Sequence, residues 1–180
     1  ESDRGRRIYV DPFLTGNPKT PESERTPERV DVVAVTHGHG DHVGDAVDIA
    51  NKHGATIIAP VELADSLSSK AENVKDPNKG GTVEIDGVRF TLTHAQHSSS
   101  DNDGKYTGEP CGIIVRAEGK TVYFAGDTNV FGDMQNVIAR LYKPDVAVLP
   151  IGDHYTMGPE EAALAVELLG VKRVVPCHWG

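Results

Sequence analysis

The sequence predicts an α/β fold in which a mixed sheet, or two sheets, is covered by helices on the outside. Two hairpin patterns in the middle of the chain favour antiparallel strands. Before and after the hairpins, apolar runs alternate with segments of helical periodicity, which favours strands joined by helices. The two patterns together indicate mixed sheets. At 180 residues the chain is long enough for a single domain with a buried core, which we place at residues 1–180.

The first half of the chain alternates short strands with amphipathic helices. The expected strands are residues 7–10, 30–36 and 55–60. Residues 30–36 are a nearly continuous apolar run, the pattern of a strand buried on both faces. A helix is expected from Val43 to Gly54, because apolar residues recur there at helical spacing and glycine commonly ends helices. A second short helix is expected at residues 61–70, and a polar loop then continues to Gly81.

The second half holds both hairpins. Residues 82–97 turn at Asp86-Gly87, a strong two-residue hairpin signal. Residues 111–127 turn at Glu118-Gly119 or at Gly119-Lys120.

Helices and buried strands follow the hairpins. One helix face is expected to consist of Phe131, Met134, Val137, Ile138 and Leu141. A buried strand at residues 144–152 precedes a helix that Pro159 opens and Gly170 closes, and the last strand covers residues 171–180.

Five of these strands end in a histidine or an aspartate. The strand ends are Thr36-His37, Gln96-His97, Gly126-Asp127, Gly152-Asp153-His154 and Cys177-His178. In open α/β sheets, ligands bind at the carboxyl ends of the strands. We therefore expect these side chains to converge if their strands share one edge.

The segment His37-Gly38-His39-Gly40-Asp41-His42 places three of the eight histidines of the chain within six positions. Imidazole and carboxylate groups suit zinc and similar divalent ions, and the two glycines allow a tight loop to turn the side chains toward a common centre. With the residues at the strand ends there are too many donors for one tetrahedral ion. His37, His39 and His97 can fill one site, Asp41, His42 and His178 a second, and Asp127 can bridge them.

The H-x-H-x-D-H pattern resembles the signature of the metallo-β-lactamase superfamily. Five further segments are similar to uncharacterised metal-dependent hydrolases of that superfamily that are related to the ascorbate-6-phosphate lactonases; they read IYVDPFLTGNP, AQHSSS, AGDTNVF, IGDHYTMGPEEA and PCHWG. The resemblance implies an αβ/βα sandwich of two mixed sheets with outer helices. It also implies a dinuclear site at one edge, with the ligands assigned above.

The two ends of the chain depart from this family pattern. The chain does not begin with Met, and Asp3-Arg4-Gly5 reads as the tip of a hairpin whose first strand is missing. The opening strand of the family, with its Gly-His pair, and the tail after the last histidine are both absent. We therefore expect a domain that lacks an N-terminal strand and a C-terminal tail, with a homo-oligomer or a complementing chain segment as possible partners.

Several polar residues have alternative interpretations. His97 is preferred over His94 as a ligand, because it lies at the strand end within AQHSSS. His154 either lines the pocket, where it would orient substrate or polarise a leaving group, or is a surface loop residue. Asp11 either accepts a hydrogen bond from a ligand imidazole or initiates a turn. The serines at residues 98–100 are expected to fix the loop around His97.

These residues predict a metal-dependent hydrolase that uses a metal-bridging hydroxide on an ester, lactone or phosphoester. Two divalent ions lower the pKa of bound water from about 15.7 to about 7. Zn²⁺ is the expected metal, with Mn²⁺, Ni²⁺ and Fe²⁺ as alternatives. The expected catalytic residues are Asp41, Asp127 and His154, and Asp127 would orient the nucleophile and accept its proton.

Charge and composition limit the other function classes. The net charge of −9 disfavours nucleic-acid binding, because phosphate backbones need a basic face. The expected metal centre keeps a net positive charge, so the expected partner is a small anionic substrate, and neither nucleic acid nor a membrane is expected. No apolar run approaches the length of a membrane span, and the two cysteines suit a reducing compartment, so a cytoplasmic location is expected. The alternatives are a phosphodiesterase or nuclease of the same superfamily, which would normally carry a basic extension, and a non-catalytic metal-binding fragment.

Overall fold

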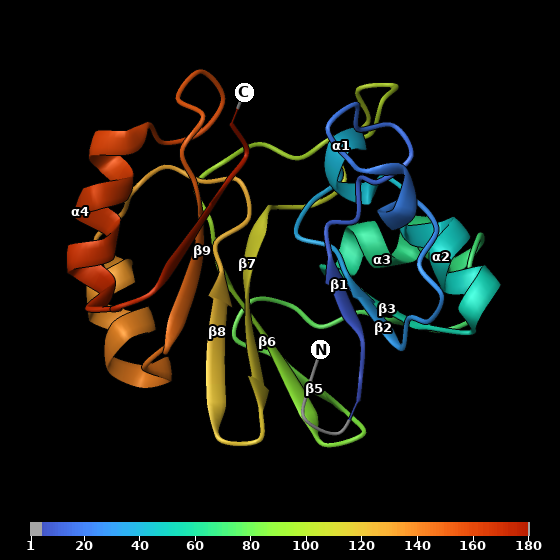
Figure 1. Ribbon diagram of the computed structural model, residues 1–180, viewed down its shortest axis with the longest axis horizontal. Coiled ribbons are helices and arrows are strands. Elements are labelled where there is room, and N and C mark those ends of the chain that lie inside the picture. Colours follow the sequence, from blue (N-terminus) through green and yellow to red (C-terminus); the bar gives the residue numbers. More distant parts are fainter. Residues whose placement is uncertain (1–4, 180) are drawn as a thin grey trace. The chain divides into compact units, whose positions relative to one another are not determined.

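The computed structural model describes residues 5–179, which divide into two compact units (Figure 1). The first unit runs to Asn78 and includes Ser99–Glu109, and the second comprises Lys79–Ser98 and the chain from Pro110 onward. The predicted turn at Asp3-Arg4 lies outside the described residues. That residues 1–180 form a single domain, and that this domain lacks an N-terminal strand and a C-terminal tail, both stay predictions.

The first unit contains a parallel sheet. Among the described residues its strands are ordered β1 (Ile8–Val10), β2 (Val32–Ala34), β3 (Thr56–Ile58) and β4 (Val74–Lys75). Each strand runs parallel to its neighbours. The sequence predicts a polar loop where β4 lies, because a two-residue strand beside polar residues leaves no period-2 pattern.

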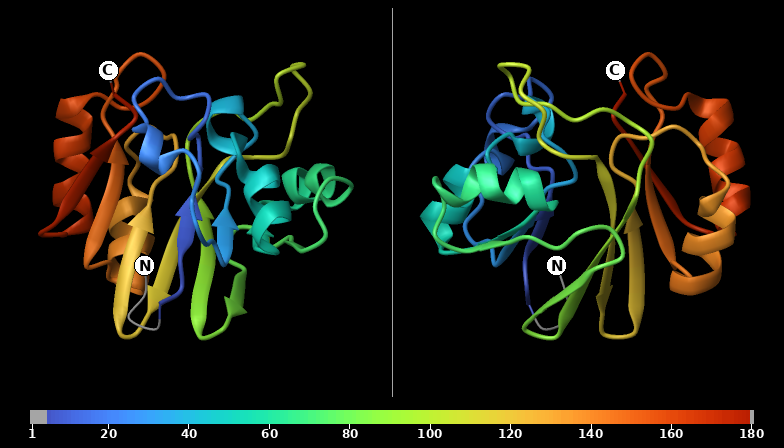
Figure 2. Two further views of the ribbon diagram at one scale, coloured as in Figure 1. Left: turned by 45° about the vertical axis from the view of Figure 1, so that its right-hand side comes forward. Right: turned by 180° about the vertical axis from the view of Figure 1, so that it is seen from behind.

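Short helices complete this unit: η1 (Glu22–Glu24), α1 (Gly40–Val43), α2 (Ala46–His53) and α3 (Val61–Ser68). Figures 1 and 2 show α2 and α3 along the sheet, and their apolar faces pack with Val33 and Ile57 into one buried core. The predicted helix from Val43 is interrupted at Gly44, whose φ is +39°. A side chain at Gly44 would overlap the carbonyl oxygen of Pro12, so this close approach of two backbones requires glycine.

The second unit contains a mixed sheet. Its order among the described residues is β10-β9-β8-β7-β6-β5. The strands are β5 (Thr82–Ile85), β6 (Val88–His94), β7 (Cys111–Ala117), β8 (Lys120–Phe124), β9 (Val146–Pro150) and β10 (Val174–Cys177). Since β7 is antiparallel to both β6 and β8, and β8, β9 and β10 are parallel, the carboxyl ends of β6, β8, β9 and β10 share one edge.

Both predicted hairpins form in this sheet. The first turns at Asp86-Gly87, with φ of +50° and +83°. The second turns at Glu118-Gly119 rather than Gly119-Lys120, with φ of +51° and +75°. Two successive residues at positive φ are the requirement of a type I′ turn, which explains the second-position glycine in each hairpin.

Two helices, η2 (Met134–Tyr142) and α4 (Pro159–Leu169), cover one face of the β8–β10 region (Figure 1). The predicted apolar face of η2 is wrong in part, because Val137 and Leu141 are 40% and 63% exposed. η2 is a π-helix, and its wider turn keeps Met134 and Ile138 on the buried face but turns Val137 and Leu141 away from it.

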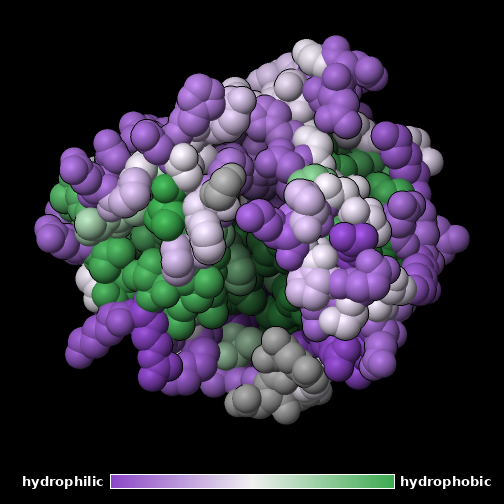
Figure 3. Space-filling view, turned by 45° about the horizontal axis from the view of Figure 1, so that its top comes forward, coloured by the Kyte–Doolittle hydropathy of each residue, from purple (hydrophilic) through white to green (hydrophobic). Residues whose placement is uncertain are grey.

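The edge strand β10 carries exposed apolar side chains. Val174 and Val175 are 36% and 51% exposed, and Figure 3 shows apolar residues gathered over the second unit at the left of the view. The carbonyl oxygens of Arg173 and Cys177 accept hydrogen bonds from β9, so the alternate residue Pro176 lies on the outer side of the ladder. Proline offers no N–H there, which hinders pairing with another strand.

Candidate metal centre

The loop after β2 brings two imidazoles into contact. His37 is fully buried, and its Nε2 lies 2.9 Å from Nδ1 of His39. Two imidazole nitrogens bound to one tetrahedral zinc ion lie about 3.3 Å apart, as follows from a Zn–N distance of about 2.0–2.1 Å. At 2.9 Å the two nitrogens lie within hydrogen-bond distance, slightly closer than two ligands of one zinc ion, so a small separation of the rings would let both bind a single ion.

The glycines of this loop make room for the segment 99–107. A side chain at Gly38 would overlap the Thr107 hydroxyl, and one at Gly40 would overlap the Asn102 amide. The N–H of Gly38 donates to Ser99 Oγ at 3.1 Å, and Ser99 Oγ lies 2.7 Å from Thr107 Oγ1. The Ser99 hydroxyl thus contacts the histidine loop of the first unit, and a role of the serines at residues 98–100 in fixing the loop around His97 stays a prediction. Neither glycine has a positive φ, so close packing explains them.

His42 lies on α1, one turn beyond the first two histidines. Its Nδ1 is 2.8 Å from Asp11 Oδ2, and its Nε2 is 3.6 Å from Asp41 Oδ2. The ring centroids of His37 and His42 are 4.1 Å apart. His37, His39, Asp41 and His42 thus form one cluster, in which Asp41 is the most exposed side chain at 47%.

Asp11 follows β1 and lies beside the end of β2, because the two strands are parallel neighbours. Its Oδ1 accepts from the Thr36 N–H at 2.8 Å, and its Oδ2 lies 2.7 Å from Thr36 Oγ1. Of the two interpretations of Asp11, the structure supports the hydrogen bond to a candidate ligand, through His42.

The second unit gathers two candidate imidazole ligands around the carboxylate of a third, Asp127. Asp127 Oδ2 lies 3.2 Å from His178 Nε2 and 3.6 Å from His97 Nε2. Asp127 is 4% exposed. These residues follow β8, β10 and β6, so the predicted convergence of strand ends is confirmed within this sheet. A carboxylate between two imidazole nitrogens can also bridge two cations.

The remaining histidines of the second unit lie elsewhere. His94 is the last residue of β6, exposed, with its Nδ1 3.3 Å from Lys79 Nζ. His154 is exposed on the loop after β9, with its ring 4.4 Å from that of Tyr155 in an edge-on arrangement. A side chain at Gly152 would overlap the carbonyl oxygen of His178, so the loop of His154 begins next to that candidate ligand. A catalytic role for His154 stays a prediction.

Asp45 anchors the loop after β1 without touching a histidine. The N–H groups of Leu14 and Thr15 donate to its Oδ2 at 2.7 and 3.1 Å, and the Thr15 hydroxyl donates to Oδ1. Burial raises the pKa of the Asp45 carboxyl, but these hydrogen bonds outweigh it and hold the pKa below its usual 3.8.

We expect Asp45→Asn to destabilise the chain by about 1–2 kcal/mol at pH 7. Because the folded-state pKa of Asp45 is lower than the unfolded one, the stabilisation is present above pH 3.8 and is lost as pH falls through the folded-state value. Urea denaturation of both proteins at pH 7 and at about pH 3 would measure this. A stability difference that stays constant over this range would contradict the assignment.

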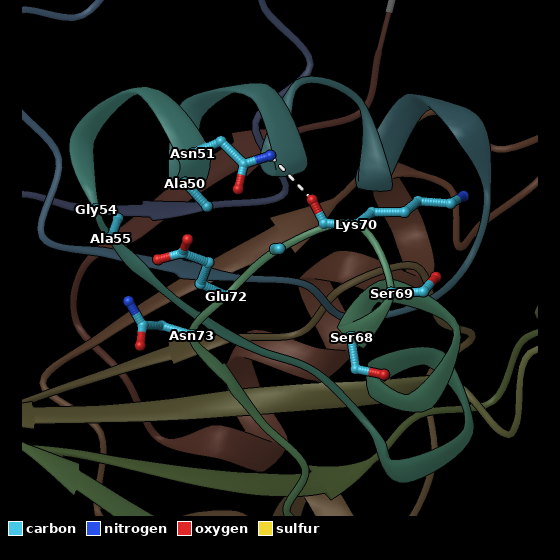
Figure 4. Close-up of a pocket in the computed structure, with 10 residues that line it drawn as sticks. Ala50, Asn51, Gly54, Ala55, Ser68, Ser69, Lys70, Glu72 and Asn73 are labelled. Carbon is cyan, nitrogen blue, oxygen red and sulfur yellow. Dashed lines mark hydrogen bonds between the residues drawn. The ribbon is translucent and has the colours of Figure 1, made fainter.

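A separate hollow lies between the ends of α2 and α3. Asn51, Lys70 and Glu72 line it, and Asn51 Nδ2 donates to the Lys70 carbonyl at 2.9 Å (Figure 4). None of the predicted ligands lines this hollow. Within residues 5–179, no helix is long and apolar enough to cross a membrane.

Known proteins of one family match this chain along nearly its whole length. The model of the beta-lactamase superfamily domain matches residues 6–179. A UPF0173 metal-dependent hydrolase of Koribacter versatilis is 45% identical over 182 residues, covering 98% of this chain and 78% of that protein. A UPF0173 metal-dependent hydrolase of Thermococcus kodakarensis is 51% identical over 178 residues, covering 97% and 77%.

A solved structure shows the same fold. Igni18, described as a novel metallo hydrolase from Ignicoccus hospitalis, is 41% identical and superposes with a TM-score of 0.88, covering 100% of this chain and 77% of that chain. This likeness confirms the predicted α/β fold of metallo-β-lactamase type, with two sheets and helices.

Proposed function

We propose that this chain, which belongs to the metallo-β-lactamase superfamily and within it to the UPF0173 metal-dependent hydrolases, hydrolyses an ester, lactone or phosphoester at a centre of two divalent ions. The family name supplies the reaction class, and the residues supply the site. The observation that carries the proposal is the His37–His39 pair, whose Nε2 and Nδ1 atoms lie 2.9 Å apart on one loop.

Seven donors are available for the two ions. We assign His37, His39 and His97 to one ion, Asp41, His42 and His178 to the other, and Asp127 as a shared ligand. Catalytic zinc commonly takes three protein ligands and leaves a position for water, so this donor set suits two ions better than one. We favour Zn²⁺ because imidazole is the main donor, although Mn²⁺, Ni²⁺ or Fe²⁺ would also fit carboxylate and imidazole.

The ions, when bound, lower the pKa of water and polarise a carbonyl or phosphoryl oxygen. The chain's part is to hold the water and to receive its proton. The Asp127 carboxylate can do both, because its Oδ2 already faces two imidazoles and its second oxygen can accept a hydrogen bond. Asp41 completes the ligand set, and His154 would orient the substrate or its leaving group from the loop beside His178.

The donor set also favours a class of substrate. Five of the seven donors are neutral imidazoles and two are carboxylates, so a centre with two divalent ions keeps a net positive charge. Such a centre attracts anionic or carbonyl-bearing substrates despite the acidic surface of the chain. We place lactones first, in keeping with the resemblance to the ascorbate-6-phosphate lactonases, and we propose the cytoplasm as the location.

A paired substrate assay tests this choice. Protein purified without chelator should contain two metal ions per chain and should hydrolyse a simple lactone faster than a small chromogenic phosphodiester. Elemental analysis gives the metal content, and pH-stat and absorbance assays give the two rates. Faster cleavage of the phosphodiester would favour the nuclease alternative. Protein without metal and without affinity for added zinc or manganese would favour a non-catalytic fragment.

A further inference from the structure

We propose that Asn102 contacts the substrate, through amide N–H groups that donate to a carboxylate of the substrate away from the bond that is hydrolysed. The inference rests on the proposed function, because it takes His39 and Asp41 as metal ligands. The Asn102 amide lies against Gly40, the residue between those two ligands. All of these residues lie in the first unit.

The side chain of Asn102 fills the place that a side chain at Gly40 would take. A Cβ atom at Gly40 would lie 2.5 Å from Asn102 Oδ1 and 3.2 Å from its Nδ2. Consecutive Cα atoms are about 3.8 Å apart, so the amide lies beside the backbone that carries a proposed ligand of each ion. Figures 1 and 2 show the yellow-green segment 99–107 beside α1, which begins at Gly40. Substrate atoms that extend past the ions on this side therefore come within reach of the amide.

The turn that carries Asn102 is held by other groups. Asp101 Oδ1 accepts the N–H groups of Asp103 and Lys105 at 3.0 and 2.8 Å. The N–H of Asp101 donates to the Lys105 carbonyl at 2.9 Å, and Gly104 has a φ of +79°. Asparagine is common in turns because its side chain can bond the local backbone, but none of these bonds uses the Asn102 amide. The turn thus holds Asn102 in place before a substrate arrives, which reduces the entropy lost on binding.

The Asn102 amide can serve as a donor to an anionic group. It is exposed, and within residues 5–179 no hydrogen bond occupies its donors. Oδ1 is the atom nearer to Gly40, so the NH₂ group, with its two donors, is the more available to a substrate. Hydrogen bonds to a carboxylate are stronger than those to a neutral oxygen. The site therefore favours a lactone or ester that carries a carboxylate near the reacting carbonyl.

Two lactones test this specificity. γ-Butyrolactone, and the same lactone with a carboxylate on its ring, are compared in pH-stat assays of the zinc-loaded protein. In Asn102→Ala, kcat/KM for the carboxylated lactone should fall about 10–100-fold, the effect of losing a hydrogen bond to a charged group, while kcat/KM for γ-butyrolactone stays unchanged. Asn102→Asp should lower the first value further, because its carboxylate repels that of the substrate. Wild-type rates in Asn102→Asp would contradict the donor role.

A substitution at Gly40 checks where the amide lies. Gly40 does not have a positive φ, so alanine fits its backbone. The new methyl group would displace the Asn102 amide, so Gly40→Ala should also lower kcat/KM for the carboxylated lactone. Added to Asn102→Ala, which removes the three atoms nearest to that methyl group, it should cause little further loss. Fully additive effects of the two substitutions would contradict the placement.

Asn51→Ala is the matched control in the same unit. The Asn51 amide donates to the Lys70 carbonyl in the hollow that none of the predicted ligands lines, so the variant should leave kcat/KM for both lactones unchanged. Zinc affinity should be equal in the wild type and in Asn102→Ala, because Asn102 is not a proposed ligand.

A titration with the reaction product gives a readout that does not depend on turnover. The product of the carboxylated lactone is a hydroxy dicarboxylate. In NMR spectra of the zinc-loaded wild type, the side-chain NH₂ signals of Asn102 should shift as this product is added, and those of Asn51 should not.

The outcomes distinguish this inference from the proposed function. A wild type that binds no metal and hydrolyses neither lactone overturns both. A wild type that prefers the carboxylated lactone, with the same preference in Asn102→Ala, overturns the role of Asn102 alone, and so does a wild type without that preference. If the zinc-loaded wild type hydrolyses neither lactone, the product titration decides: shifted Asn102 signals support the contact, and unmoved signals contradict it.

Discussion

Replacing Asp127 with asparagine should reduce kcat by about 10²–10⁴-fold, the usual contribution of a general base, while the chain keeps its fold. Asparagine matches the size of the carboxylate but carries no charge and cannot accept a proton from water at neutral pH. It also weakens the contacts to His97 and His178, whose Nε2 atoms lie 3.6 and 3.2 Å from Asp127 Oδ2. Steady-state hydrolysis measured alongside circular dichroism would check both parts of the expectation.

A matched control for this substitution lies in the same unit. Asp145 accepts the Thr121 N–H through its Oδ2 at 2.8 Å and has no role in the proposed centre. Asp145→Asn should therefore cost some stability and leave kcat close to that of the wild type. Turnover of Asp127→Asn within a factor of three of the Asp145→Asn value would remove Asp127 from the reaction.

Removal of the metal should abolish hydrolysis and lower the melting temperature, and stoichiometric zinc should restore both. A ligand that binds only the folded chain stabilises it by about 2.7 kcal/mol at 100 times its Kd and by about 4.1 kcal/mol at 1,000 times. The loss of stability on adding chelator therefore reports the metal affinity independently of any substrate. Differential scanning calorimetry with and without chelator would measure it.

His37→Ala serves as the comparison for the chelator experiment. The variant lacks a proposed ligand, so chelator should shift its melting temperature less than that of the wild type. Equal shifts in the two proteins would mean that the stabilising ion lies elsewhere, and no shift in the wild type would contradict the metal centre.

Much of the site could be predicted from the sequence because strand ends are visible in it. Apolar runs that stop at His97, Asp127 and His178 mark where the strands of one sheet end, and parallel direction brings such ends to one edge. The hairpin turn at Asp86-Gly87 was equally readable, because few dipeptides tolerate two successive positive φ values.

The supporting contacts were less accessible to sequence reasoning. Thr36 and Ser99 act on the histidine loop through single hydroxyl groups, and a hydroxyl leaves no periodic pattern. Gly38 and Gly40 were correctly linked to the tight loop, but the cause is packing against residues 102 and 107, far along the chain. The π-helix at Met134–Tyr142 was predicted as a helix whose face wrongly included Val137 and Leu141, since its sequence pattern does not reveal the wider turn.

The first unit is built from two separate stretches of the chain. Its residues 99–109 return to it only after the chain has built the first two strands of the other sheet. A fragment that stops at Asn78 would retain every histidine of the 37–42 motif but would lack the Ser99 hydroxyl that accepts the Gly38 N–H, and the Thr107 side chain beside it. Neither unit can therefore be excised intact by a single cut, and limited proteolysis between Asn78 and Lys79 should loosen the loop of residues 37–42 rather than release an autonomous module.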